Sequence, residues 1–80
     1  MSWLQSSATL RKLLVEQRQA EGLSQAELAG RLGRPQAFIS RLESGQRRLD
    51  VFEFVDIAEA LHLDPVTLFA NSIKALHRIR

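Results

Sequence analysis

The sequence predicts an all-α protein, a compact bundle of five helices. Two observations support this fold class: apolar residues recur at helical spacing in five segments, and a capping residue or a helix-ending residue separates each segment from the next. Repeats, low-complexity stretches and linkers are absent from the sequence. The 80 residues suit one domain spanning residues 1–80, with a core so small that association with a second copy would help it.

The first helix is expected over residues 8–20, with Gly22 as its stop. One side of this helix carries Leu10, Leu13, Leu14 and Gln17. No glycine or proline interrupts the segment.

Two short helices follow. An S-x-x-E capping box starts at Ser24, so a helix should begin at Gln25 and end at Gly33, which can adopt the left-handed conformation. The next helix begins at Pro35, where the missing amide hydrogen costs nothing, and ends at Gly45. The expected core residues are Ala26, Leu28, Ala29 and Leu32 in the first of these helices and Phe38, Ile39 and Leu42 in the second. Because about three residues connect them, the two helices must cross steeply.

The fourth helix begins after Asp50, whose side chain can cap it while Glu53 reaches back to form a second capping box. His62 is its expected stop, because histidine tolerates the left-handed conformation better than most residues. The fifth helix has Asp64 as its cap and Pro65 at its first position, and extends to about residue 79. The expected core residues are Val51, Phe54, Val55, Ala58 and Leu61 in the fourth helix and Val66, Phe69, Ile73 and Leu76 in the fifth.

The fifth helix has more apolar surface than a monomer needs. A second apolar face lies beside its core stripe, and two aromatic residues elsewhere have no evident core position. Such exposed patches usually mark a partner surface. We therefore predict a dimer interface formed by Phe52, Leu68, Ala75 and Ile79, with Phe52 or Trp3 at its edge. The alternative is that Trp3 and Leu4 fold back over the fifth helix and complete a monomer.

Charge is unevenly distributed, although the net charge is only +2. Residues 34–48 contain four arginines and one acid, whereas residues 50–64 contain five acids and no lysine or arginine. A polyanion attracts the first segment and repels the second, so the surface should be polarised, with its basic side toward phosphates. The alternative is two ordinary solvated faces.

Other classes of function find little support. The chain has no cysteine, so neither disulfides nor thiolate metal sites hold the fold, and His62 and His77 are too isolated for a metal site. There is no glycine-rich phosphate loop and no evident Ser-His-acid set, so we expect no enzyme, no cofactor and no small-molecule ligand. No apolar run approaches the roughly 18 residues of a membrane span, and residues 1–10 do not resemble a signal peptide, so a cytoplasmic protein is expected.

Residues 10–69 resemble the helix-turn-helix domain of phage repressors and Cro proteins, often called the xenobiotic-response-element (XRE) type. The matching segments are Gly22-Leu23-Ser24-Gln25, Glu27-Leu28-Ala29 and Ile39-Ser40-Arg41-Leu42-Glu43, followed by Gly45. The resemblance implies a lambda-repressor-like DNA-binding domain with its motif at about residues 24–44. The alternative is an unrelated five-helix bundle.

The resemblance implies that the second motif helix enters the major groove of double-stranded DNA. Because Ile39 and Leu42 face inward, the opposite residues are expected to contact bases, and these are Gln36, Ala37, Ser40 and Arg41. Gln36 can pair with adenine and Arg41 with guanine, whereas Ala37 offers only an apolar contact. Pro35 departs from the small hydroxyl residue common at its position, which removes an expected capping or phosphate hydrogen bond.

Phosphate contacts position such a domain without reading sequence. Gln25 resembles the phosphate-binding glutamine of the family, at the start of the first motif helix. The expected phosphate contacts are Gln25, Arg34, Arg47 and Arg48. In the resembling family an arginine on the first helix also forms a structural ion pair with a glutamate near the end of the reading helix, and Arg18 and Glu43 occupy those positions here.

The function implied is a sequence-specific transcriptional regulator that binds a two-fold symmetric operator as a homodimer, in a bacterial or phage setting. The alternative is an antitoxin or another protein-interaction module whose DNA binding is secondary.

Overall fold

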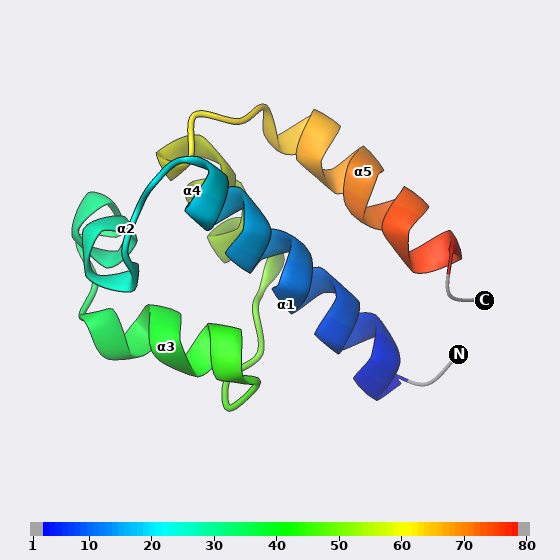
Figure 1. The fold of residues 1–80 in the computed structure, drawn as a ribbon, viewed down its shortest axis with the longest axis horizontal. Helices are drawn as coiled ribbons and strands as arrows, with labels where there is room; N and C mark the ends of the chain where they lie inside the picture. The colour runs from blue at the N-terminus through cyan, green and yellow to red at the C-terminus, as the bar shows by residue number, and fades with distance from the viewer. Residues whose placement is uncertain (1–2, 79–80) are drawn as a thin grey trace.

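A computed structural model describes residues 3–78, with side chains from Gln5 onward. Five helices make up this part of the chain: α1 (Trp3–Ala20), α2 (Gln25–Leu32), α3 (Gln36–Ser44), α4 (Val51–Ala60) and α5 (Pro65–His77). The predicted all-α fold is thereby confirmed. In Figure 1, α1 crosses the middle of the molecule, with α3 on one side of it and α5 on the other.

The motif helices α2 and α3 are bounded as the sequence predicts. The Ser24 hydroxyl accepts a hydrogen bond from the Glu27 amide, and the Glu27 carboxylate accepts one from the Ser24 amide, each at 3.0 Å. Both helices end at a glycine in the left-handed conformation, Gly33 with φ of 66° and Gly45 with φ of 85°. Pro35 differs by one position from the prediction: it precedes the first helical residue and provides no side-chain cap.

Among the other helix ends, the start of α1 differs most from the prediction. α1 begins at Trp3 instead of near residue 8, because residues 3–8 contain no glycine or proline to interrupt the helix. Asp50 and Asp64 cap α4 and α5 as predicted. His62 has a φ of 59°, so histidine does occupy the left-handed position after α4.

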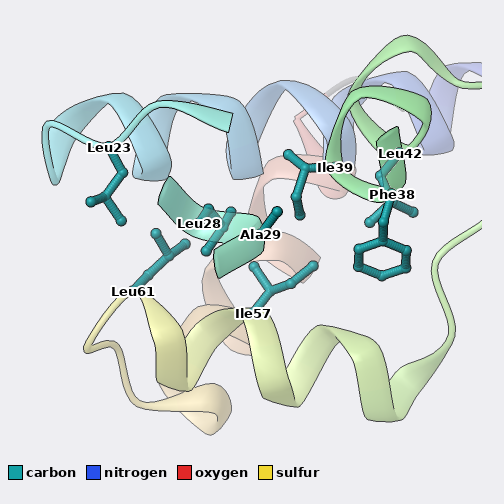
Figure 2. Packing of buried hydrophobic residues seen from close by; sticks show 8 residues of the cluster. All are labelled: Leu23, Leu28, Ala29, Phe38, Ile39, Leu42, Ile57 and Leu61. Atoms are coloured by element: carbon teal, nitrogen blue, oxygen red, sulfur yellow. The ribbon is translucent and has the colours of Figure 1, made fainter. Parts of the chain in front are cut away.

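The core has two connected clusters. The larger one joins α2, α3 and α4 beneath α1, as the labelled side chains in Figure 2 show, and consists of Leu23, Leu28, Ala29, Phe38, Ile39, Leu42, Ile57 and Leu61. The smaller one joins α4 to α5 and consists of Phe54, Ala58 and Leu68. Leu14 of α1 and Leu49 of the α3–α4 loop pack against both clusters.

The predicted core faces of α2 and α4 need correction. Ala26 is exposed, and Val51 and Val55 are 62% and 36% exposed. Ile57, which the prediction omitted, is buried beside Ala58. The buried face of α4 follows positions 54, 57, 58 and 61, so the two valines lie at the edge of that face.

The apolar residues of α5 differ from the prediction in their burial. Leu68 is buried, whereas Val66, Phe69 and Ile73 are 76%, 51% and 37% exposed, so the predicted core stripe is wrong for these residues. The buried face continues with Ser72, whose hydroxyl donates to the Leu68 carbonyl at 2.8 Å. Because this hydrogen bond satisfies the hydroxyl inside the helix, a polar residue can occupy the core side.

Candidate nucleic-acid interface

The exposed side of α3 carries the residues expected to contact bases. Gln36, Ala37 and Arg41 are exposed and Ser40 is half-buried, while the opposite side of the helix packs into the core. The Ser40 hydroxyl donates to the Ala37 carbonyl at 3.3 Å within the helix. The face therefore presents one amide, one guanidinium and one hydroxyl around a small apolar side chain, a set able to address base edges in a major groove.

An ion pair fixes the C-terminal end of α3 to α1. Arg18 Nε and Nη2 donate to the two carboxylate oxygens of Glu43 at 2.7 and 2.9 Å, and Arg18 Nη1 donates to the Leu23 carbonyl at 2.7 Å. Both side chains are largely buried, at 11% and 12% exposed. We call Arg18 and Glu43 the inner anchor; the pair implied by the family resemblance is present.

Gln25 joins the inner anchor instead of pointing to solvent. Its Nε2 donates to Glu43 Oε1 at 2.9 Å, and the side chain is half-buried. The first residue of α2 is thereby tied to the end of α3. Its amide group is thus engaged within the protein in this structure.

A second cluster connects α3 to the start of α4, and sequence analysis missed it. Arg47 donates to both carboxylate oxygens of Glu53 at 2.7 Å, and Arg34 Nη2 lies 3.8 Å from the same carboxylate. The guanidinium carbons of Arg34 and Arg47 lie 4.5 and 4.7 Å from the centre of the Phe38 ring. We call Arg34, Phe38, Arg47 and Glu53 the outer anchor.

Glu53 has two structural tasks in the outer anchor. Its amide donates to Asp50 Oδ1 at 2.7 Å and its Oε1 accepts from the Asp50 amide at 3.1 Å, which completes the predicted capping box. The hydrogen bonds from Arg47 lower the pKa of the Glu53 carboxyl; burial opposes this effect, and the Asp50 amide adds to it. The capping role was predictable from the D-x-x-E pattern, but the arginine contacts depend on how α4 packs.

The outer anchor also corrects the expected charge polarisation. Glu53 belongs to the acidic segment, yet it is buried between arginines of the basic segment. Arg34, Arg41 and Arg48 are exposed, and Arg47 is 37% exposed at its side chain. The basic side thus retains exposed guanidinium groups, although one of its four arginines is committed to a buried carboxylate.

The residues expected at a dimer interface are dispersed. Phe52 is 78% exposed, Ala75 is half-buried, and Ile79 lies outside the described residues, as do the side chains of Trp3 and Leu4. Leu68 is only 3% exposed, so the prediction that it offers a free surface is wrong.

Within residues 3–78, every helix is too short or too polar to span a membrane. Nor does that part of the chain bring together three or more histidine, aspartate or glutamate side chains in a way that could hold a metal ion.

Comparison with known proteins identifies the family. Residues 9–69 match the model of the helix-turn-helix domain, so the chain belongs to that family. A structure described as an XRE-family like protein from Pseudomonas syringae is 45% identical, with a TM-score of 0.82 over 86% of this chain and 84% of the other. The chain is thus a DNA-binding transcriptional regulator of the XRE type.

Restriction-modification controller proteins are similar as well. The controller protein C.AhdI from Aeromonas hydrophila is 32% identical, with a TM-score of 0.71 over 78% of this chain and 94% of the other. The wild-type controller protein C.Esp1396I is 22% identical, with a TM-score of 0.83 over 98% and 99%, a likeness of fold alone. No curated protein sequence gives a significant match.

Proposed function

We propose that this regulator binds a two-fold symmetric operator as a homodimer in the cytoplasm, with α3 in the major groove. The observation that carries the proposal is the division of α3 into a buried apolar side and an exposed side with Gln36, Ala37 and Arg41. The inner anchor ties the C-terminal end of α3 to α1, and the outer anchor contacts α3 through Phe38 and ties the following loop to α4. A fixed angle is what a reading helix needs, because base contacts tolerate little displacement.

For the DNA contacts, we assign base reading to Gln36, Ala37, Ser40 and Arg41. Phosphate contacts are assigned to the backbone amides of the first turn of α2 at Gln25, since its side chain donates to Glu43, and to the exposed Arg34 and Arg48. Arg47 becomes a positioning residue, because its guanidinium is engaged by Glu53. This changes the role that the sequence suggested for it.

Selection of bound sites from a random DNA pool would test the proposal. We expect an operator with two similar half-sites about 34 Å apart, one DNA turn. On this operator, Arg41→Ala or Gln36→Ala should cost roughly 1 to 3 kcal/mol and relax the preference at one base position. Arg48→Ala should instead weaken binding to all sequences and reduce the salt slope by about one. Arg78→Ala, at the end of α5, is the control for loss of a positive charge. Unchanged base preference in Arg41→Ala would contradict the assignment.

The proposed dimer interface is the exposed apolar surface of α4 and α5. Its members are Val51, Phe52, Val66, Phe69 and Ile73. Phe69 meets Phe54 edge-on with ring centres 6.0 Å apart, so the exposed residues of α5 adjoin α4. Exposed apolar side chains of this size are costly in water, and their burial against a second copy suits a self-complementary two-fold contact.

Sedimentation would test this interface. Phe52→Asp and Phe69→Asp should each produce a folded monomer with sharply reduced operator affinity, whereas Ala26→Asp, an exposed apolar position on α2, should remain dimeric. A wild type that stays monomeric well above the concentration that saturates the operator would contradict the homodimer. That result would favour an antitoxin-like role in which the same patch binds a different protein.

A further inference from the structure

A hollow of about 320 Å³ lies on the core side of α3 and extends to Arg48, one of the proposed phosphate contacts. The first half of α1, the end of α3, the α3–α4 loop and the end of α5 surround it. Its apolar lining includes Leu10, Leu14, Leu42, Leu49, Ile57 and Leu76. Leu14 and Leu49 touch both core clusters, so the hollow lies where the two clusters meet.

Arg11 brings a positive charge to the rim of the hollow. Its guanidinium lies against the glycine that ends α3: a Cβ on Gly45 would be 3.0 Å from Arg11 Cζ. Among the side chains described, no carboxylate forms an ion pair with Arg11, and its nearest compensation is the negative end of the α3 dipole. Of the other charged groups at the rim, Glu43 is engaged by Arg18 and Arg47 by Glu53, and Arg48 is a second, exposed cation there.

We propose that the hollow binds a small amphipathic carboxylate, with the carboxylate on Arg11 and the apolar part among the leucines. A volume of about 320 Å³ is at the lower end of the roughly 300–1,000 Å³ typical of small-molecule sites, which limits the ligand to a short chain or a single ring. A neutral apolar molecule would leave Arg11 without a partner, and a fully polar anion would leave the leucine lining in contact with water. An anion with an apolar body satisfies both.

The consequence would be regulatory, because Ile39 and Leu42 of α3 line the same hollow. A ligand there would contact the core side of the helix that we assign to base reading. The binding step itself goes beyond the proposed function and does not depend on it, since it can be measured without DNA.

Calorimetric titration of the full chain with sodium octanoate would test the site, with 1-octanol as the neutral comparison. We expect saturable binding of one octanoate per chain and about tenfold weaker binding of octanol, because the charge-assisted hydrogen bond is lost. Arg11→Gln should weaken octanoate binding by about tenfold and leave octanol binding unchanged. Lys12→Gln, which removes an exposed charge from the next position of α1, should bind octanoate as the wild type does.

A second pair of variants tests the location. Leu49→Trp fills the hollow and should abolish binding of both molecules. Circular dichroism would check that this variant folds. If it does not, Leu10→Phe, which fills less of the hollow, replaces it in the same test. Absence of saturable octanoate binding, or equal affinity in Arg11→Gln and the wild type, would overturn the proposal. Because these measurements contain no DNA, such a failure would leave the proposed operator binding intact.

Discussion

The inner and outer anchors hold the same helix with the same chemistry but in different surroundings. In the inner anchor both partners are buried, Arg18 at 11% and Glu43 at 12% exposed. In the outer anchor the carboxylate of Glu53 is 8% exposed, whereas Arg47 is 37% and Arg34 is 48% exposed. Removal of either partner of the inner anchor leaves a buried charge, whereas removal of Glu53 from the outer anchor leaves arginines that water can hydrate. We therefore expect the inner anchor to contribute more to the free energy of unfolding than the outer anchor, which positions the start of α4.

The largest effect should come from Arg18→Met, which leaves Glu43 buried without its main partner. We expect a loss of about 3 to 5 kcal/mol in the free energy of unfolding, measured with urea. Arg41→Met, an exposed arginine on α3, is the control and should change stability by less than about 0.5 kcal/mol. A cost for Arg18→Met close to that of the control would show that the two anchors do not differ.

Glu53→Gln should come next, because it removes the charge that the outer anchor shares between two arginines. The expected loss is about 1 to 3 kcal/mol, less than for Arg18→Met since both arginines can turn to water. Arg47→Met should cost less than Arg18→Met, because the Asp50 amide and Arg34 still contact the Glu53 carboxylate. If Arg47→Met were as costly as Arg18→Met, exposure would not be the deciding difference.

Lowering the pH should weaken the outer anchor. Arg47 lowers the pKa of Glu53 in the folded state, so the folded protein binds fewer protons than the unfolded chain in the acidic range. The stabilisation is complete above the unfolded pKa of about 4.3 and is lost as the pH falls through the lower folded value. Urea midpoints recorded between about pH 2 and pH 6 should fall less steeply in Glu53→Gln than in the wild type. Asp56→Asn, an exposed carboxylate on the same helix, provides the comparison; an identical slope in Glu53→Gln and the wild type would contradict the linkage.

The smallest effect should come from Arg34→Met. Its guanidinium is half exposed and 3.8 Å from Glu53, so its removal should cost about 0 to 0.5 kcal/mol of stability. Thermal unfolding compared with Arg47→Met would rank the two arginines of the outer anchor. A larger loss for Arg34→Met than for Arg47→Met would mean that the contact with Phe38 outweighs the hydrogen bonds to Glu53.

Local chemistry made the helix boundaries of the motif predictable. Ser24 with Glu27, Asp50 with Glu53, and the two glycines at 33 and 45 act within one turn of the backbone, so their effect does not depend on the rest of the fold. The outward residues of α3 were equally predictable, because Phe38, Ile39 and Leu42 leave one side free.

Packing between helices was less predictable. The apolar residues of α5 favoured the stripe through Val66 and Phe69, but the helix buries Leu68 and Ser72, and the internal hydrogen bond of Ser72 has no counterpart in a hydrophobicity pattern. The outer anchor was missed for a similar reason. Arg47 and Glu53 meet because the loop between α3 and α4 turns back, which depends on where α4 lies against the core.

The shortness of α3 has a consequence for the amount of active regulator. A helix of nine residues is well below the about 12–15 residues at which an isolated helix becomes even marginally stable in water. The proposed DNA-reading surface therefore exists only while the anchors and the core are intact, and a peptide of residues 36–44 should not retain it. Any protease that captures the unfolded chain would remove reading activity and protein in the same step. The folding equilibrium would then help to set how many active copies persist.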